Sequence, residues 1–258
     1  MKAKSETRPR FEMQDSLYAF PYHHIPYFDE KGAPRRIRQL EWGLEYLCYT
    51  EHLREHILNQ MPQSVLDVGC GDGALLARLE KEIPRVVGVD LSERAVALAR
   101  ALCERAEVEV RDLRSLDEEF DVVMAVEVLE HIPDEFVGEF VGALYARVRP
   151  GGLLAITVPA RALPLGAKHY RHYDIPALLA TLNPERNNAQ IESIDYVYKR
   201  SPWVHAYLRM TMNRFWTLEV PRIQAALWRH VWRHCRRADA SNGWHVAAFV
   251  RKSRSAVR

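Results

Sequence analysis

Short apolar runs alternate with segments of helical periodicity through the middle of the chain. The runs rich in β-branched residues span 64–68, 86–89, 108–110, 121–126 and 153–158. After the second run, apolar residues from Ala95 to Leu102 follow the i, i+3, i+4, i+7 spacing of one helix face. Strands and helices in this alternation predict a parallel sheet that is covered by helices on both faces.

Two flanking regions do not follow this alternation. Upstream, the apolar positions of 37–47 predict a helix, and we interpret the aromatic segment 17–28 ahead of it as a lid or pocket wall. Downstream, 191–198 and 244–250 are predicted to be two further strands, separated by a helical segment from 202 to about 237. A connection of this length between two short strands predicts a hairpin that carries an insertion.

Composition and charge narrow the class of protein. With 258 residues, 48% of them hydrophobic, the chain can bury a sizeable core, which excludes disorder. Its 36 Lys and Arg balance 34 Asp and Glu, so the formal charge of +2 gives no chain-wide field for nucleic acid, and DNA is not an expected partner. Residues 1–10 are charged and no apolar stretch of spanning length occurs, so we expect neither a signal peptide nor a spanning helix.

The cysteines stand singly along the chain. They are Cys48, Cys70, Cys103 and Cys235, with no Cys-x-x-Cys pair. This usage is typical of a reducing cytosol rather than of a secreted scaffold or a zinc site. We therefore expect a cytoplasmic protein, with peripheral contact to a membrane left open.

The first predicted strand ends in a glycine-rich turn, Asp67-Val68-Gly69-Cys70-Gly71-Asp72-Gly73. Glycines allow the backbone to turn sharply and to approach a ligand closely, and the following helix presents its N-terminus. The pattern indicates a nucleotide-sized site at the carboxyl edge of a parallel sheet. Alone it is ambiguous, because Gly69-x-Gly71-x-x-Ala74 also satisfies the loose dinucleotide fingerprint.

Acidic residues after the next strands resolve the ambiguity. Asp90 follows the second strand, where a carboxylate can accept both hydroxyls of a ribose, and Asp112 follows the third. Phe120-Asp121 opens the fourth strand, and the turn 149–152 precedes the fifth. From about 60 to 175, the chain therefore resembles the class I S-adenosylmethionine-dependent methyltransferases. Within them it is similar to the broad subgroup that includes the ubiquinone-biosynthesis O-methyltransferases. A nicotinamide enzyme would not be expected to show this set of motifs.

The resemblance implies S-adenosyl-L-methionine as the cofactor. The cofactor-binding residues that it implies are Asp67, Gly69, Cys70, Gly71, Asp72, Gly73, Asp90, Leu91, Asp112, Leu113 and Glu127. Among them, Asp90 would bind the ribose, and Asp112 with Leu113 would flank the adenine. A cationic sulfonium also favours nearby carboxylates. The alternative is that acids such as Asp72 only cap turns, and Cys70 is interpreted as a small filler rather than a nucleophile.

A second group of candidate residues follows the fourth and fifth strands. Glu127-Val128-Leu129-Glu130-His131 comes first, and 168–174 adds His169 and His172. If 127–131 is helical, both carboxylates and the imidazole of His131 project toward one side, above the sheet edge. The candidate catalytic bases for a hydroxyl or thiol acceptor are His131, His169 and His172, and structural hydrogen bonding is the alternative role for each.

The same segments resemble a metal-binding motif. The small-RNA 3′-terminal 2′-O-methyltransferases hold a divalent ion with Glu-x-x-Glu-His and a later His. By that resemblance, the candidate ligands of Mg²⁺ or Mn²⁺ are Glu127, Glu130, His131 and His169. The alternative is that Glu130 and His131 only form hydrogen bonds to the loops around the pocket.

The insertion before the last strand combines positive charge with tryptophan. From Lys199 to Arg237 there are nine cationic residues, one acidic residue and four tryptophans. Three interpretations stay open: a helix that lies on a membrane surface, a groove for RNA or another polyanion, or an ordinary amphipathic helix packed on the domain.

The predicted fold is α/β, a doubly wound Rossmann-like sheet of seven strands with an N-terminal aromatic and helical extension and a basic helical insertion before the last strand. The expected parts of this one structural domain are a lid and helix (1–60), an S-adenosylmethionine-binding core (61–175) and a strand pair with the insertion (176–258). The predicted function is O-methylation of a small-molecule, glycan or lipid-linked acceptor. The alternatives are metal-assisted RNA 2′-O-methylation, which is less favoured, and a non-catalytic cofactor-binding regulatory module.

Overall fold

The computed structural model describes residues 3–18, 27–28, 32–35, 40–213, 216, 218 and 220–254. Its main element is an eight-stranded mixed sheet with the order β5-β4-β3-β6-β7-β10-β8-β9. The strands are β3 (Ser64–Val68), β4 (Arg85–Asp90), β5 (Glu107–Val110), β6 (Phe120–Val126), β7 (Val148–Pro159), β8 (Ala189–Val197), β9 (Arg237–Ala238) and β10 (His245–Lys252). A separate two-stranded sheet joins β1 (Tyr27–Phe28) to β2 (Pro34–Arg35).

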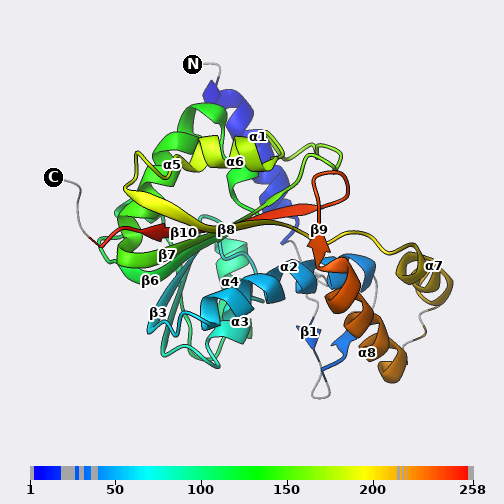
Figure 1. The fold of residues 1–258 in the computed structure, drawn as a ribbon. Coiled ribbons are helices and arrows are strands. Elements are labelled where there is room, and N and C mark those ends of the chain that lie inside the picture. The colour runs from blue at the N-terminus through cyan, green and yellow to red at the C-terminus, as the bar shows by residue number, and fades with distance from the viewer. Residues whose placement is uncertain are drawn as a thin grey trace.

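Helices cover both faces of the large sheet (Figure 1). Their bounds are α1 (Ala3–Ser16), α2 (Leu40–Leu58), α3 (Leu76–Leu79), α4 (Glu93–Leu102), α5 (Asp134–Arg147), α6 (Ile175–Leu182), α7 (Pro202–Thr211) and α8 (Pro221–His230). A π-helical turn, Val231–Cys235, continues α8. Short 3₁₀ turns lie at Leu113–Ser115 and Leu129–His131.

Local signals in the sequence explain where several helices begin and end. Ser92 caps α4 by accepting a hydrogen bond from the amide of Ala95, and Asp174 caps α6 in the same way from the amide of Ala177. At the end of α6, Asn183 adopts the left-handed conformation with φ of 40°. The caps place the following side chains on the sheet, where they form two buried clusters, one on each face.

The predicted fold is confirmed, with differences at the C-terminal end. The strands β3 to β7 run parallel, and β10 lies antiparallel between β7 and β8. The sheet has eight strands rather than seven, because Arg237 and Ala238 pair with the end of β8 as the insertion returns to the domain. The predicted strand pair is therefore a hairpin whose connection holds α7 and α8.

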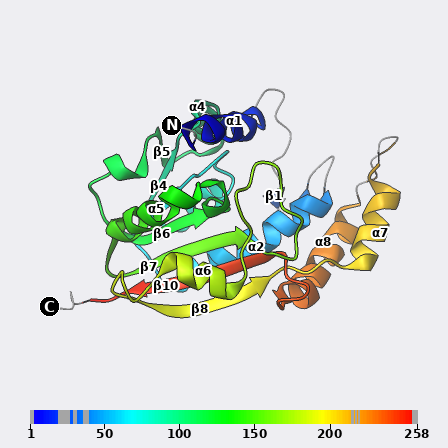
Figure 2. The ribbon, with the colours of Figure 1, turned by 90° about the horizontal axis from the view of Figure 1, so that it is seen from above.

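The carboxyl ends of β3, β4, β6 and β7 meet at one edge of the sheet, as expected for parallel strands. Strand β8 ends at the same edge, because β7 and β8 both pair antiparallel with β10. Seen from above, the insertion lies beyond these strand ends (Figure 2). Within the described residues, no helix is long and apolar enough to cross a membrane.

Candidate active site

A cavity of about 980 Å³ lies along the carboxyl edge of the sheet. This volume is at the upper end of the range for small-molecule sites, so it has room for two ligands. We divide its wall into two parts. The glycine-loop half comprises Asp67, residues 69–72 and Asp90, while Gly73 lies outside the wall, against Ala99 and Cys103. The histidine half comprises Glu130, His131, Lys168, His169 and His172.

The turn after β3 brings backbone amides and Asp90 together. Gly69 and Gly71 have φ of 76° and 58°, a conformation that favours glycine. The amide of Gly71 donates to one carboxylate oxygen of Asp90 at 3.0 Å, and the amide of Ser92 donates to the other at 2.8 Å. These bonds orient the carboxylate at the cavity wall, and each oxygen retains a lone pair for a ligand hydroxyl.

Asp67 is the most deeply buried acid of the glycine-loop half. Its side chain is 2% exposed, and its Oδ1 has no hydrogen-bond partner among the described residues. Burial, with smaller contributions from the charges of Asp90 and Asp72, raises the pKa of Asp67 to about 8. A buried carboxylate without a partner is suited to a cationic ligand, and S-adenosylmethionine carries both a sulfonium and an ammonium.

Other residues that the sequence indicated also line this half, with roles that differ. Asp72 accepts a hydrogen bond from the amide of Ala74 at 3.0 Å, so it caps the turn. Asp112 caps the Leu113–Ser115 turn and pairs with Arg114 at 2.6 Å, while Leu91 and Leu113 lie in the cavity wall. Burial raises the pKa of the Cys70 thiol, which agrees with its interpretation as a filler.

The ring nitrogens of the histidine half differ in their hydrogen-bond partners. His131 Nδ1 lies 3.3 Å from the Lys168 carbonyl and must donate to it, which leaves Nε2 with a lone pair. His172 Nδ1 must likewise donate to the Leu163 carbonyl at 3.1 Å. His169 Nδ1 lies 2.7 Å from His172 Nε2, so this contact engages Nδ1 of His169 and not its Nε2.

The electrostatic surroundings keep the rings of His131 and His169 neutral. Burial, followed by the charge of Lys168, lowers the pKa of His131 to about 4. Burial also lowers the pKa of His169 to about 3, with a further contribution from His131. The two ring centroids are 4.8 Å apart, so the neutral rings belong to one small region of the cavity.

Three of the four predicted metal ligands lie together. Ligand atoms of Glu130, His131 and His169 are all within 4.8 Å of one another. Glu130 is 1% exposed, and its Oε2 has no hydrogen-bond partner within the described part of the chain. Glu127 is not in this group, because residues 127–131 are not helical as expected: Glu127 has φ of 55°, and only Leu129–His131 forms a 3₁₀ turn.

Glu127 instead belongs to an ion-pair cluster that sequence analysis missed. His245, at the start of β10, lies 3.1 Å from a carboxylate oxygen of Glu127 and 2.9 Å from one of Glu45 on α2. Burial alone would lower the pKa of His245, but the two carboxylates outweigh it and raise that pKa to about 10. The three side chains line the cavity, yet they are far apart in sequence and only the strand order brings them together.

Helix α1 closes the cavity on another side. The Arg10 guanidinium donates to the His169 carbonyl at 2.6 Å, and Gln14 accepts from Lys168 Nζ at 2.9 Å. Asp15 forms a hydrogen bond with Ser92 beyond Asp90, so α1 contacts both halves. The lid was expected in 17–28. Leu17 and Tyr18 do line the cavity, while Phe20 and Tyr22 lie outside the described residues.

Comparison with known proteins points to the same chemistry. A family model described as a methyltransferase domain matches residues 35–234. The ubiquinone biosynthesis O-methyltransferase of Bradyrhizobium sp. (strain ORS 278) is 36% identical over 99 residues, which cover 36% of this chain and 38% of that protein. The enzyme of the same name from Paramagnetospirillum magneticum (strain ATCC 700264 / AMB-1) is 42% identical over 97 residues, 35% of this chain and 38% of that protein. The chain thus spans less than half the length of these relatives.

Solved structures share the fold at low sequence identity. Magnesium protoporphyrin IX methyltransferase from Synechocystis PCC 6803 is similar with a TM-score of 0.60 and 15% identity, covering 95% of this chain and 99% of that chain. A methyltransferase from Archaeoglobus fulgidus gives a TM-score of 0.56 and 19% identity, over 79% of this chain and 93% of that one. These likenesses establish the architecture of the sheet.

Proposed function

The chain belongs to the methyltransferase-domain family and is an S-adenosylmethionine-dependent methyltransferase, and we propose that it methylates a hydroxyl oxygen of a small, lipid-like acceptor. The observation that carries this proposal is the pair of neutral imidazoles, His131 and His169, whose ring centroids lie 4.8 Å apart in the same cavity as Asp90. A hydroxyl acceptor must lose a proton on methylation, and a neutral imidazole is suited to receive it.

The residues of the glycine-loop half fit the cofactor. When bound, S-adenosylmethionine supplies a methyl carbon that its sulfonium has already activated. Asp90 would accept the ribose hydroxyls, and the unpartnered oxygen of buried Asp67 would lie toward the positive charge. Because the displacement is in line, most of the protein's contribution to this step is positioning.

In the histidine half, an imidazole accepts the proton of the acceptor hydroxyl. The acceptor oxygen forms its bond to the methyl carbon, the carbon–sulfur bond breaks, and the hydroxyl proton passes to Nε2 of His131 or to His169. Glu130 lies beside the His131 base, since its Oε1 is 3.8 Å from His131 Nε2, and burial raises the pKa of its carboxyl well above the usual value. The products are the methyl ether, S-adenosylhomocysteine and a proton that the imidazole releases to solvent.

Apolar side chains support a lipid-like acceptor. Those that line the cavity include Phe11, Phe136, Phe140, Leu163 and Pro164. They come from α1, α5 and the loop after β7, and they give the cavity apolar surface that favours an aromatic or isoprenoid group. The similarity to ubiquinone biosynthesis O-methyltransferases over 36% of the chain supports an oxygen as the methylated atom.

Transfer of a labelled methyl group to defined acceptors tests this proposal. A phenol with an isoprenoid tail, presented in detergent micelles, should become labelled as an alkali-stable ether, and the same phenol with its hydroxyl already methylated should not. Label that appears only on thiol, amine or RNA acceptors would overturn the proposal.

The cluster of Glu130, His131 and His169 favours a second candidate, metal-assisted 2′-O-methylation of RNA. These groups could hold Mg²⁺ or Mn²⁺ with open positions for a ribose hydroxyl, although Glu127, the expected fourth ligand, faces His245. Thermal unfolding with Mn²⁺ and with EDTA distinguishes the two candidates. A rise in Tm with Mn²⁺, together with label in RNA, would favour the second candidate. An unchanged Tm would leave the imidazoles as the bases.

A further inference from the structure

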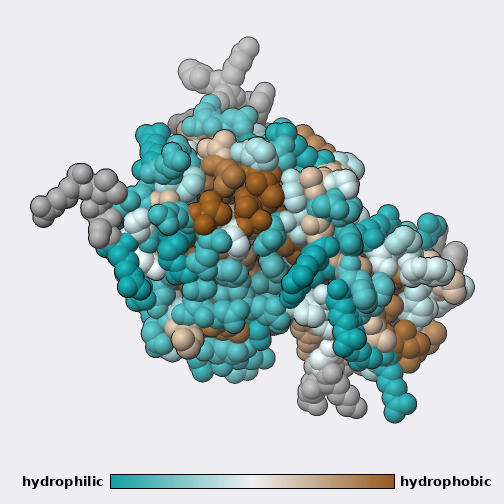
Figure 3. Space-filling view, in the orientation of Figure 1, coloured by the Kyte–Doolittle hydropathy of each residue, from teal (hydrophilic) through white to brown (hydrophobic). Residues whose placement is uncertain are grey.

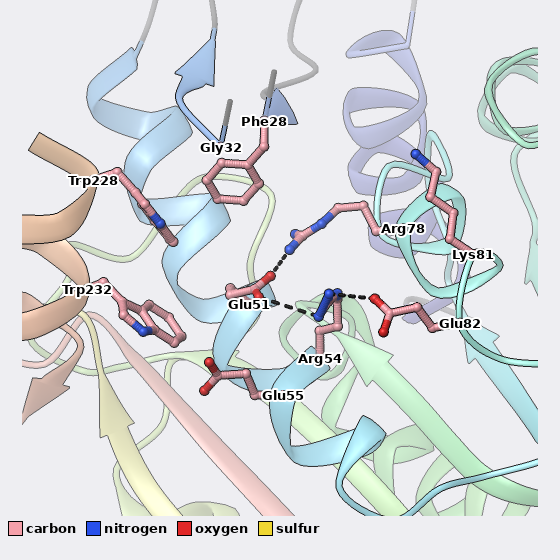
Figure 4. Close-up of a pocket in the computed structure, with 10 residues that line it drawn as sticks. All are labelled: Phe28, Gly32, Glu51, Arg54, Glu55, Arg78, Lys81, Glu82, Trp228 and Trp232. Carbon is pink, nitrogen blue, oxygen red and sulfur yellow. Dashed lines mark hydrogen bonds and ion pairs between the residues drawn. The ribbon is translucent and has the colours of Figure 1, made fainter. Parts of the chain in front are cut away.

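The insertion between β8 and β10 is anchored to the domain by only part of its aromatic residues. Trp228 and Trp232 stack with ring centroids 5.5 Å apart, and Phe28 meets Trp228 edge-on at 4.8 Å. These rings face α2 and α3 across a cavity of about 340 Å³ (Figure 4). Ion pairs in this cavity engage Glu51, Arg54, Arg78 and Glu82. Most of the charges that line this cavity are therefore already paired within the protein.

The other side of the insertion exposes apolar residues. We call the following five the outer patch: Trp203, Met210, Trp216, Leu218 and Ile223. Trp203 is 82% exposed, Met210 69% and Trp216 60%. Trp216 is held against the end of α7 by its indole, whose Nε1 donates to the Met210 carbonyl at 3.0 Å.

The outer patch is more than scattered surface residues. Its members are five of the fourteen exposed large hydrophobic residues in the described part of the chain, and they lie within 203–223. On α7 the opposite face is buried through Val204 and Leu208, so the helix packs on the domain with one side and presents Trp203 and Met210 with the other. In the space-filling view, a small brown area lies at the lower end of α8 and the surface over α7 is mostly white to tan, with hydrophilic residues around both (Figure 3). Exposed apolar side chains grouped in this way indicate an interaction site.

The insertion that carries the outer patch is also rich in cations. Its exposed arginines include Arg209, Arg222, Arg229 and Arg233. None of these four forms an ion pair with another described residue, and between Lys199 and Arg237 the sequence has a single acid, Glu219. The surface therefore combines apolar side chains with uncompensated positive charge, which attracts an anionic surface.

The insertion begins at the same edge of the sheet as the active-site cavity. Strand β8 runs parallel to β7, so its carboxyl end lies at the edge that holds the cavity, and α7 begins shortly after this end. A surface that binds the outer patch would therefore lie near the edge of the sheet that holds the cavity.

We propose that the outer patch and its arginines dock the protein on an anionic lipid bilayer, with Trp203 and Trp216 inserted at the headgroup level. Tryptophan prefers the interface between headgroups and acyl chains, and aliphatic side chains such as Met210, Leu218 and Ile223 enter the apolar region. RNA is the other polyanion that arginines attract, but bases stack on flat rings, and three of the five residues of the outer patch are not aromatic. This proposal concerns where the enzyme binds and does not depend on the acceptor.

Vesicle co-sedimentation of the full chain tests the proposal. We expect binding to vesicles of phosphatidylcholine with phosphatidylglycerol, about tenfold or more weaker binding to pure phosphatidylcholine, and weakening when NaCl rises from about 0.1 M to about 0.5 M. The variant Trp203→Ser with Trp216→Ser should lower the partition coefficient about tenfold or more. Neither residue lines the active-site cavity, so its affinity for S-adenosylhomocysteine should be unchanged.

A matched control distinguishes binding through the outer patch from nonspecific binding through any exposed apolar residue. Met61 is 81% exposed and lies outside the insertion, so Met61→Ser should bind vesicles like the wild type. Equal binding by the double tryptophan variant and the wild type would overturn the proposal. It would also be overturned if wild-type protein ignored anionic vesicles but bound single-stranded RNA in a way that depends on Trp203 and Trp216.

Discussion

The two halves of the cavity are built from opposite kinds of chemistry. The glycine-loop half presents buried carboxylates and comes from two consecutive strand–turn units, with Asp67 on β3 and Asp90 at the end of β4. The histidine half presents neutral imidazoles from two loops and is closed by α1. One half is therefore arranged to bind a cation and the other to accept a proton. Substitutions in the first half should weaken cofactor binding, and substitutions in the second should lower turnover.

The largest expected effect is on turnover in the histidine half. Replacing both His131 and His169 with Ala removes the candidate bases, and kcat should fall by about 10²–10⁴-fold while the affinity for S-adenosylmethionine stays within about twofold. Steady-state kinetics with a methylated phenol as product would measure both values. His234→Ala, on the exposed part of the insertion, is the control. A loss of cofactor binding in the double variant would remove the distinction between the halves.

The next effect concerns the cluster of His245, Glu45 and Glu127, which links α2 to the start of β10 and to the end of β6. His245→Gln leaves two carboxylates without their cation, and Tm at neutral pH should fall by roughly 5–10 °C. Because the pKa of folded His245 is raised to about 10, its stabilisation is complete below the unfolded pKa near 6.5 and is lost as pH rises through about 10. Thermal unfolding of the wild type should therefore show falling stability over that range, and the variant should show a flatter profile. Identical profiles would contradict the ion-pair assignment.

A smaller effect is expected from Asp67→Asn, and its two consequences have opposite signs. The raised pKa of Asp67 means that ionising it in the fold costs stability, a cost that grows as pH rises from about 4 to about 8. The variant should thus raise the Tm of the cofactor-free protein by a few degrees, about 2–5 °C. Its affinity should fall about tenfold for S-adenosylmethionine and less for S-adenosylhomocysteine, which lacks the sulfonium charge.

Exposed Asp117→Asn serves as the control for this comparison. In the wild type, affinity for S-adenosylmethionine should also increase as pH rises through about 8, since the carboxylate binds the cation in its ionised form. Titration calorimetry at a series of pH values measures this affinity. If Asp67→Asn binds both ligands as the wild type does, the buried carboxylate has no role toward the cofactor.

Sequence analysis predicted the two halves unequally. The glycine-loop half is local: each strand is followed at once by its turn and its acid, so Asp67, Gly71 and Asp90 could be assigned from their order. For the histidine half, the clusters at His131 and His169 predicted two segments that line the cavity in the structure. The backbone at Glu127, whose φ of 55° turns its carboxylate away, was not evident from residue spacing.

Two further elements depend on tertiary structure. His245 becomes part of the cavity only because β10 inserts between β7 and β8 and places its first residue beside Glu127. Helix α1 was not predicted, since its sequence has no apolar periodicity and includes Pro9. It is positioned by contacts to distant loops, such as Arg10 to the His169 carbonyl. Such contacts leave no local pattern in the sequence.

The central claim is that Asp90 and its glycine turn bind the cofactor while the histidines act on the acceptor. Calorimetric titration of S-adenosylhomocysteine into the wild type, Asp90→Ala and His131→Ala tests it most directly. We expect Asp90→Ala to bind S-adenosylhomocysteine about 100-fold or more weakly, because two charge-assisted hydrogen bonds to the ribose are lost. We expect His131→Ala to bind it as the wild type does. Unchanged binding in Asp90→Ala, or equal losses in both variants, would contradict it.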